Sequence, residues 1–186
     1  MAEEIIEQGY RELADTILEH NPGVDLGRVR AAFELADRAH SGQKRKAGTP
    51  YVTHCVAAAQ ICAEMGLDED SIVAALLHDC IEDTAITHED IARQFGAEVA
   101  DIVEGVTKLT RVQFTSREDE QMENLRKMLM AMAKDIRVIL IKIADRLHNM
   151  RTMEYMVAQK QLEKSLETME IYAPIAHRLG LQKVKW

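Results

Sequence analysis

Aromatic side chains are scarce in this chain of 186 residues, at 4% of the sequence, and it contains only three prolines. A core with few aromatics must be built from aliphatic residues and the ten methionines, a composition that favours helices over sheets. Only three cysteines are present, Cys55, Cys62 and Cys80, and none belongs to a Cys-x-x-Cys pair. This odd number argues against a disulfide framework and predicts reduced thiols in the core.

Long apolar runs and an excess of positive charge are also lacking. No stretch approaches the roughly 18 uninterrupted apolar residues of a membrane span, and the acidic start of the chain does not have the pattern of a signal peptide. The formal net charge of −8 argues against direct binding of nucleic acid but leaves a small phosphorylated ligand open. We therefore expect a cytoplasmic protein that binds neither membranes nor nucleic acid.

Helical periodicity dominates what is present. Capping residues and helix breakers predict helices over residues 3–19, 25–40, 53–65, 68–83, 88–96, 97–109, 117–133, 136–150 and 159–179, the last kinked at Pro174. The expected N-caps are Asp25, Asp68, Thr87, Ser116 and Asp135, and Gly66 and Gly96 are expected to end helices. The segments 41–52 and 110–116 predict loops. No linker or repeat divides residues 1–186, so we expect one all-α domain.

Two ionisable residues, His78 and Asp79, end the apolar run AALLHD, where burying them is costly without a partner. A satisfied polar pair would explain this dipeptide alone. However, Asp145 lies in a second apolar helix, and His54 begins a third. Two imidazoles and two carboxylates suit Mn, Fe or Zn better than Ca or Mg. Together they predict one divalent metal with positions left open for water and substrate.

Two more carboxylates, Glu82 and Asp83, follow at helical spacing from His78 and Asp79. Beside a metal-bound water, such a pair can orient the water or accept its proton. The alternative is a solvated acidic helix end, although acidic residues there oppose the helix dipole. We therefore assign Glu82 and Asp83 as candidate catalytic residues.

Further polar residues lie near the predicted ligands. His148 and Asn149 are three and four residues after Asp145, so they share its helix face; Asn149 could bond a ligand, and His148 is equally compatible with a structural role. The run Lys44-Arg45-Lys46 precedes His54, and an arginine there could grip phosphate or stack on a base. Solvated surface is the other interpretation of this basic run.

Five segments resemble one family, the hydrolase domain of the RelA/SpoT homologues, which make and degrade ppGpp. They are AHSGQKRKAGTPYVTH (39–54), AALLHDCIEDT (74–84), FGAEVADIVEGVTKL (95–109), ENLRKMLMAMAKDIRVILIKIADRLHNMRTM (123–153) and ETMEIYAPIAHRLGL (167–181). The resemblance implies a helical HD-domain bundle, one Mn²⁺ at the four predicted ligands, and removal of the 3′-pyrophosphate from ppGpp or pppGpp. Fe or Zn remains open as the metal.

The resemblance also implies where the substrate binds. Family positions around the guanine base correspond to Arg45, Lys46, Ala47, Asn149 and Thr152, and Lys142, Arg146 and Lys160 are candidates for neutralising the outer phosphates. The chain departs from the family in having Cys55 where proline is usual and Ala47 where serine is frequent. Neither change removes a metal ligand.

The family resemblance further predicts that this domain is the N-terminal part of a longer bifunctional protein with synthetase and regulatory domains. Two other functions remain open at this point. One is an HD phosphohydrolase that acts on another nucleotide, and the other is a sensing module that binds a nucleotide without turnover.

Overall fold

Helices form nearly all of the regular structure in the computed structural model, which describes residues 2–110, 126, 130 and 134–181. In chain order the elements are α1 (Ala2–His20), α2 (Leu26–Ala39), α3 (Val52–Glu64), α4 (Glu69–Leu77), α5 (Cys80–Asp83), α6 (His88–Phe95), α7 (Ala97–Thr110), α9 (Ile136–Arg151), the 3₁₀ turn η1 (Met153–Tyr155), α10 (Ala158–Glu167), the π-helical turn η2 (Thr168–Tyr172) and α11 (Ala173–Arg178). These described residues contain no strand, only an isolated bridge between Lys44 and Pro50. The all-α prediction is confirmed. The predicted helix over 117–133, its Ser116 cap and the predicted loop over 110–116 fall largely outside the described residues.

The predicted N-caps explain where several helices begin. Side-chain oxygens of Asp25, Asp68 and Asp135 accept hydrogen bonds from backbone N–H groups in the first turns of α2, α4 and α9. Thr87 and Asp90 form a reciprocal capping box at the start of α6. These bonds satisfy backbone donors that have no partner inside the helix.

Three glycines set helix ends and helix packing. Gly66 and Gly96 follow α3 and α6 with φ of 73° and 97°, a left-handed conformation that disfavours any side chain. Gly105 lies where α7 crosses α9, and a Cβ there would lie only 2.8 Å from Cγ2 of Val138. The missing side chain therefore permits the close approach of these two helices.

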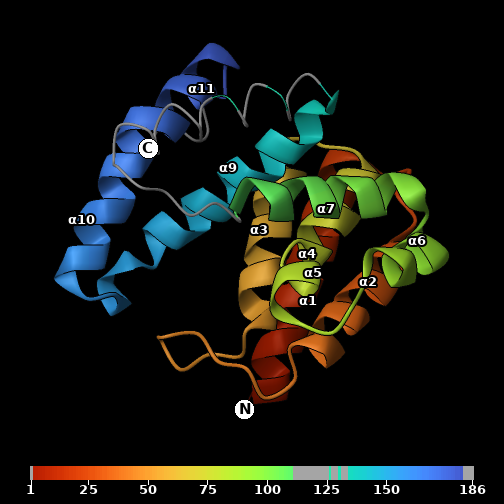
Figure 1. Ribbon diagram of the computed structural model, residues 1–186. Coiled ribbons are helices and arrows are strands. Elements are labelled where there is room, and N and C mark those ends of the chain that lie inside the picture. Colours follow the sequence, from red (N-terminus) through yellow and green to blue (C-terminus); the bar gives the residue numbers. More distant parts are fainter. Residues whose placement is uncertain (1, 111–125, 127–129, 131–133, 182–186) are drawn as a thin grey trace.

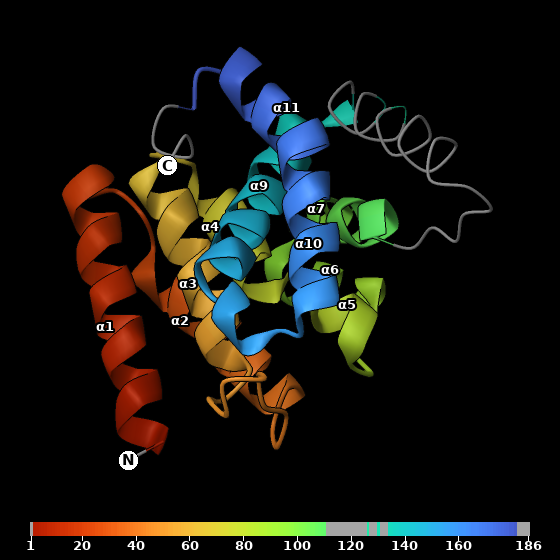
Figure 2. The same ribbon diagram turned by 90° about the vertical axis from the view of Figure 1, so that its left-hand side faces the viewer.

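The main core surrounds α3 and α4. Every residue of α4 from Ser71 to Leu77 is buried, and α3 packs against α1, α2, α4 and α9. Figure 2 shows α1 on one side of this centre and α9 on the other. The three cysteines are buried and unpaired, as predicted. No helix among the described residues combines the length and apolar character needed to cross a membrane.

A smaller core forms where α10 and α11 fold back from the end of α9 (Figure 1). Ile139 and Ile143 of α9 pack there against Ile171, Tyr172 and Ile175. The helix predicted over 159–179 is interrupted by η2, directly before Pro174 at the start of α11. Proline has no N–H for the preceding turn, which accounts for the irregular helix at this point.

Candidate metal centre

Four polar side chains from three parts of the fold meet inside the protein. His54 comes from the first turn of α3, His78 and Asp79 from the junction of α4 and α5, and Asp145 from the middle of α9. His54 Nε2 lies 3.2 Å from Asp145 Oδ1 and 3.6 Å from Asp79 Oδ2. His78 Nε2 lies 3.1 Å from Asp79 Oδ2 and 4.0 Å from Asp145 Oδ1. The four side chains therefore face one point.

The junction between α4 and α5 corrects the prediction of one continuous helix over 68–83. Regular helix ends at Leu77, and Asp79, with φ −95° and ψ −5°, starts the separate turn α5. Here the His78 ring takes the place of a backbone N–H group: its Nδ1 donates a hydrogen bond to the carbonyl of Ala75 at 2.8 Å. The break turns both side chains toward the same centre, although periodicity alone favours an unbroken helix.

Hydrogen bonds at Nδ1 of both imidazoles leave their Nε2 atoms facing the centre. A carbonyl only accepts, so His78 Nδ1 carries hydrogen and Nε2 is the nitrogen that can bind a metal once its own proton is lost. His54 Nδ1 lies 2.7 Å from Nδ1 of His148, which leaves His54 Nε2 facing the two carboxylates. Burial, together with nearby His54 and Arg45, lowers the pKa of His148 to about 4, so this ring stays neutral and one of the two Nδ1 atoms donates to the other. Both Nε2 atoms are thus directed at the same point.

This arrangement fits a cation. Among the described residues His78 Nε2 has no hydrogen-bond partner, although Asp79 Oδ2 lies 3.1 Å away. One donor atom each from His54, His78 and Asp145 lie within 4.8 Å of one another. Burial opposes a charge on His78, but Asp79 and Asp145 outweigh burial and raise its pKa to about 9. A divalent ion would replace that proton.

Asp145 is held in its ionised form by its neighbours. Lys142 Nζ lies 2.7 Å from Asp145 Oδ2, and the amide of Asn149 donates to Asp145 Oδ1. Burial would raise the pKa of Asp145, but the Lys142 ammonium, with His54 and His78, keeps it well below its usual range. The oxygen of the same Asn149 amide accepts from Arg45 at 2.7 Å. A chain of polar contacts therefore links the basic loop to the centre.

A cavity of about 470 Å³ opens above these residues. Its wall contains His54, Asp79 and Asp145 together with Arg45, Tyr51, Glu82, Asp83, Leu109, Lys142, Arg146, Asn149, Met150, Met153, Met156, Lys164, Glu167 and Tyr172. The sequence-predicted acids Glu82 and Asp83 thus share one cavity with three of the four predicted ligands. Positive, negative and apolar side chains all face this space, which suits a charged ligand with a flat organic part.

Some predicted binding residues lie elsewhere. Lys46, Ala47, Thr152 and Lys160 do not line this cavity. The first two are exposed on the loop, the hydroxyl of Thr152 donates to the backbone of its own helix, and Lys160 is exposed on α10. Arg146 reaches the cavity but is paired with Glu167 at 2.8 Å. The roles assigned to these residues stay predictions.

The structure adds residues that the sequence did not indicate. Lys164 and Glu167 reach the cavity because α10 folds back over α9, which no local pattern predicts. Tyr51 lies three residues before His54, and its hydroxyl donates to Asp79 Oδ2 at 2.7 Å. In the sequence, only its position at the end of the basic loop indicated that Tyr51 lies near the centre.

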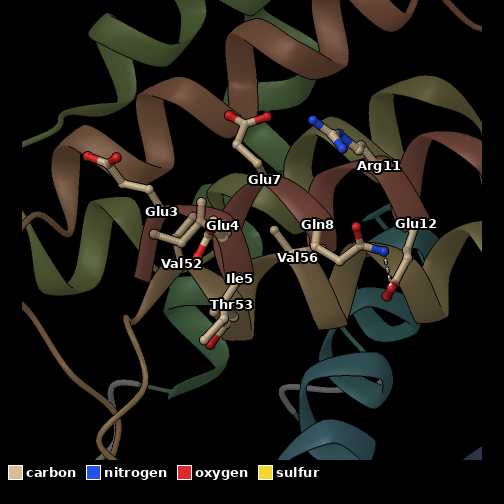
Figure 3. A pocket seen from close by; sticks show the side chains of 12 residues that line it. Glu3, Glu4, Ile5, Glu7, Gln8, Arg11, Glu12, Val52, Thr53 and Val56 are labelled. Carbon is tan, nitrogen blue, oxygen red and sulfur yellow. Dashed lines mark hydrogen bonds between the residues drawn. The ribbon is translucent and has the colours of Figure 1, made fainter. Parts of the chain in front are cut away.

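A second, larger hollow of about 840 Å³ lies between α1 and α3. Figure 3 shows the side chains that line it. The Gln8 amide donates a hydrogen bond to Glu12, and Val52 and Val56 of α3 form the other wall. Its acids are glutamates along α1, and Glu7 is already paired with Arg30. No imidazole or thiol lines it, so we assign the chemistry to the smaller cavity.

Comparisons with known proteins show which family the chain belongs to. The sequence matches the HD domain family over residues 32–182. It is 49% identical to the Escherichia coli protein named bifunctional (p)ppGpp synthase/hydrolase SpoT, over 95% of this chain and 25% of that protein. It is 52% identical to the Haemophilus influenzae guanosine-3′,5′-bis(diphosphate) 3′-pyrophosphohydrolase, over 81% of this chain and 22% of that protein. It is 53% identical to the Streptomyces coelicolor GTP pyrophosphokinase, over 87% of this chain and 19% of that protein.

A solved structure is also similar, that of a metazoan ortholog of SpoT described as hydrolyzing ppGpp. The TM-score is 0.64 at 29% identity, and the match covers 77% of this chain and 83% of that one. The chain spans about a fifth to a quarter of the length of the three curated relatives.

Proposed function

This chain belongs to the HD domain family, and from that premise we propose that it hydrolyses the 3′-pyrophosphate of ppGpp and pppGpp with one bound Mn²⁺, giving GDP or GTP and pyrophosphate. The observation that carries the proposal is the convergence of two imidazole nitrogens and two carboxylates on one point beside Glu82 and Asp83. The names of the similar proteins support the choice of substrate.

The residues that would hold the metal are His54, His78, Asp79 and Asp145. When bound there, a divalent cation polarises a phosphate and lowers the pKa of a water toward neutrality. Mixed nitrogen and oxygen donors match the preferences of Mn²⁺ better than those of Mg²⁺ or Ca²⁺. The two Nε2 atoms already face inward because each Nδ1 is held in a hydrogen bond elsewhere, so the site is arranged before the ion enters and displaces the His78 proton.

The carboxylates of Glu82 and Asp83 would serve the attacking water. Both line the cavity and lie three and four residues after Asp79, at the end of the turn α5. A carboxylate at this place can orient a water and accept the proton that the water loses as it attacks phosphorus. The departing 3′ oxygen then takes up a proton to become the ribose hydroxyl.

The remaining wall of the cavity would hold the nucleotide. Arg45 is fixed at the rim by its bond to Asn149, so its planar guanidinium is available to a base or a phosphate. Lys164 adds positive charge on the side formed by α10. The thioethers of Met150, Met153 and Met156 supply an adaptable apolar surface for a flat base.

We also propose that synthetase and regulatory domains accompany this domain in the full-length protein. The matched relatives are four to five times longer than the matching segment, and one is named a bifunctional synthase/hydrolase.

The direct test is turnover of ppGpp, GTP, dGTP and a cyclic dinucleotide by the purified protein with added Mn²⁺. We expect pyrophosphate release from ppGpp and little from the others. Cleavage of another nucleotide with ppGpp untouched would instead assign a different HD phosphohydrolase. Tight ppGpp binding without pyrophosphate release would assign a sensing module.

Two variants separate metal binding from proton transfer. Asp79→Ala should abolish both Mn²⁺ binding and turnover. Glu82→Gln should bind Mn²⁺ normally but turn over roughly 10²–10⁴-fold more slowly, the usual range for a general acid or base. Glu89→Gln, an exposed acid outside the cavity, is the matched control and should behave like wild type. Wild-type turnover by Glu82→Gln would remove that residue from its role.

A further inference from the structure

Tyr51 occupies an unusual position between two acids of the centre. Its hydroxyl lies 2.7 Å from Oδ2 of Asp79 and 3.2 Å from Oδ2 of Asp83. An ionised carboxylate can only accept, so the phenol donates its single hydrogen to Asp79 in the shorter contact and shares it with Asp83 as the more distant acceptor. One side chain from the basic loop therefore touches a predicted metal ligand and a predicted catalytic acid together.

Charge repulsion acts between these two acids. Asp79 and Asp83 stand at either end of α5, a single turn closed by the bond from Asp83 N to Asp79 O at 2.9 Å. Like charges four residues apart on a helix repel each other. A shared hydroxyl donor opposes that repulsion and keeps both carboxylates turned to the same side.

The Tyr51 ring is itself held firmly. It stacks on the buried ring of His40, with centroids 4.5 Å apart and planes 20° apart. Gln43 joins the same unit: its Oε1 accepts from His40 Nδ1 at 3.0 Å, and its amide donates to the carbonyl of Asp83 at 3.2 Å. The backbone N–H of Tyr51 donates to the Gln43 carbonyl at 3.1 Å. The loop is thus fastened to α5 by the side chains of Tyr51 and Gln43, and a backbone bond joins these two residues to each other.

The same oxygen of Asp79 faces the imidazoles. Asp79 Oδ2 is the atom that lies 3.1 Å from His78 Nε2 and 3.6 Å from His54 Nε2. A carboxylate oxygen has two lone pairs, and the phenol uses one of them. The other stays directed toward the place where the imidazole nitrogens converge. The bond to Tyr51 therefore selects the carboxylate orientation that a metal requires.

We propose that Tyr51 is a positioning residue of this centre: its hydroxyl fixes Asp79 for the metal and holds Asp83 beside it for the water. This inference rests on the proposed function, since it assigns Tyr51 to the same metal-dependent reaction. It adds a residue that acts through the two acids without touching the ion.

The test is Tyr51→Phe, which keeps the ring on His40 and removes only the hydroxyl. Mn²⁺ alone is titrated by calorimetry into chelator-treated protein, and kcat and KM for ppGpp are then measured at saturating Mn²⁺. We expect Mn²⁺ affinity to fall about 10–100-fold, as for other lost partners of metal ligands. We also expect kcat to fall while KM stays unchanged. Tyr10→Phe is the matched control, because its hydroxyl bonds a backbone carbonyl far from the centre.

Unchanged Mn²⁺ affinity in Tyr51→Phe would overturn the proposal, and so would a lower unfolding midpoint with normal affinity and normal kcat. Asp83→Asn and the double variant give a second measurement. If Tyr51 acts partly through Asp83, the two losses of kcat will be less than multiplicative. Fully multiplicative losses would contradict that part.

If Tyr51→Phe does not fold, Gln43→Met is the second variant that tests how the loop positions the two acids. This change removes the bond to the Asp83 backbone carbonyl and the partner of the His40 ring that supports Tyr51, while the phenol keeps its bond to Asp79. Asp83 is then held less firmly against the loop, so kcat should fall with Mn²⁺ affinity retained. Normal kcat in Gln43→Met would contradict the proposal. Failure of the wild-type protein to bind Mn²⁺ would instead overturn the proposed function, so the two failures are distinguishable.

Discussion

Lys142 tests how the centre balances its buried charges. Its ammonium lies 2.7 Å from Asp145 Oδ2, and the two residues are 8% and 5% exposed. Lys142→Met keeps an unbranched side chain but removes the charge, which leaves the buried carboxylate without its main partner. Breaking a buried pair in this way costs about 3–5 kcal/mol. That is a large part of the roughly 5–15 kcal/mol that stabilises an ordinary protein.

The assay is urea unfolding of chelator-treated protein at neutral pH. With a slope of about 1–3 kcal/mol per molar urea, the midpoint of Lys142→Met should fall by at least about 1 M. Added Mn²⁺ should narrow the difference, because a cation beside Asp145 compensates its charge. The exposed Lys160→Met is the control and should unfold like wild type. A chelated Lys142→Met protein as stable as wild type would refute the reasoning.

Three further outcomes follow from the contacts. Because the pKa of His78 is raised to about 9, Mn²⁺ must displace a proton from this ring, so the affinity of the protein for Mn²⁺ should rise between pH 6 and 9. Calorimetry should show the released proton as a binding enthalpy that depends on the buffer, and an Mn²⁺ affinity independent of pH would contradict this. Asp135→Ala removes the N-cap of α9 and a partner of Arg137, and urea unfolding should show a loss of about 0.5–2 kcal/mol. Because the bond to Arg137 lowers the pKa of Asp135, this contribution is present above an unfolded pKa of about 3.9 and disappears as the pH falls through the lower folded value; an equal loss at pH 2 would count against it. Arg45→Ala should raise KM for ppGpp and leave kcat nearly unchanged, whereas an unaltered KM would exclude a substrate contact for the guanidinium bonded to Asn149.

Local signals in the sequence were sufficient for most helix boundaries. Asp25, Asp68, Thr87 and Asp135 act at short range on backbone groups two or three residues away, so their capping role is visible in the sequence. The break at His78 was not foreseeable in this way. Apolar periodicity continues through it, and the bond from the ring to the helix backbone appears only once the ring is buried.

The predicted ligands could be found because ionisable residues in apolar helices are rare without a partner. The partners of these ligands were harder to predict. Contacts of His148 with His54 and of Tyr51 with Asp79 join segments 94 and 28 residues apart, and they depend on how α3, α5 and α9 pack. Lys164 enters the cavity only because α10 returns over α9. Such long-range placement is set by packing and leaves no local pattern.

The central claim is that a single cation, held by residues of three helices, is used to hydrolyse ppGpp. Chelator-treated protein is titrated with Mn²⁺ while metal binding and pyrophosphate release are followed in the same samples. Activity should be absent at first, rise with binding, and level off at one Mn²⁺ per chain, and Asp79→Ala protein should show neither signal. Full turnover by the chelated protein, or ppGpp left intact at saturating Mn²⁺, would contradict the account.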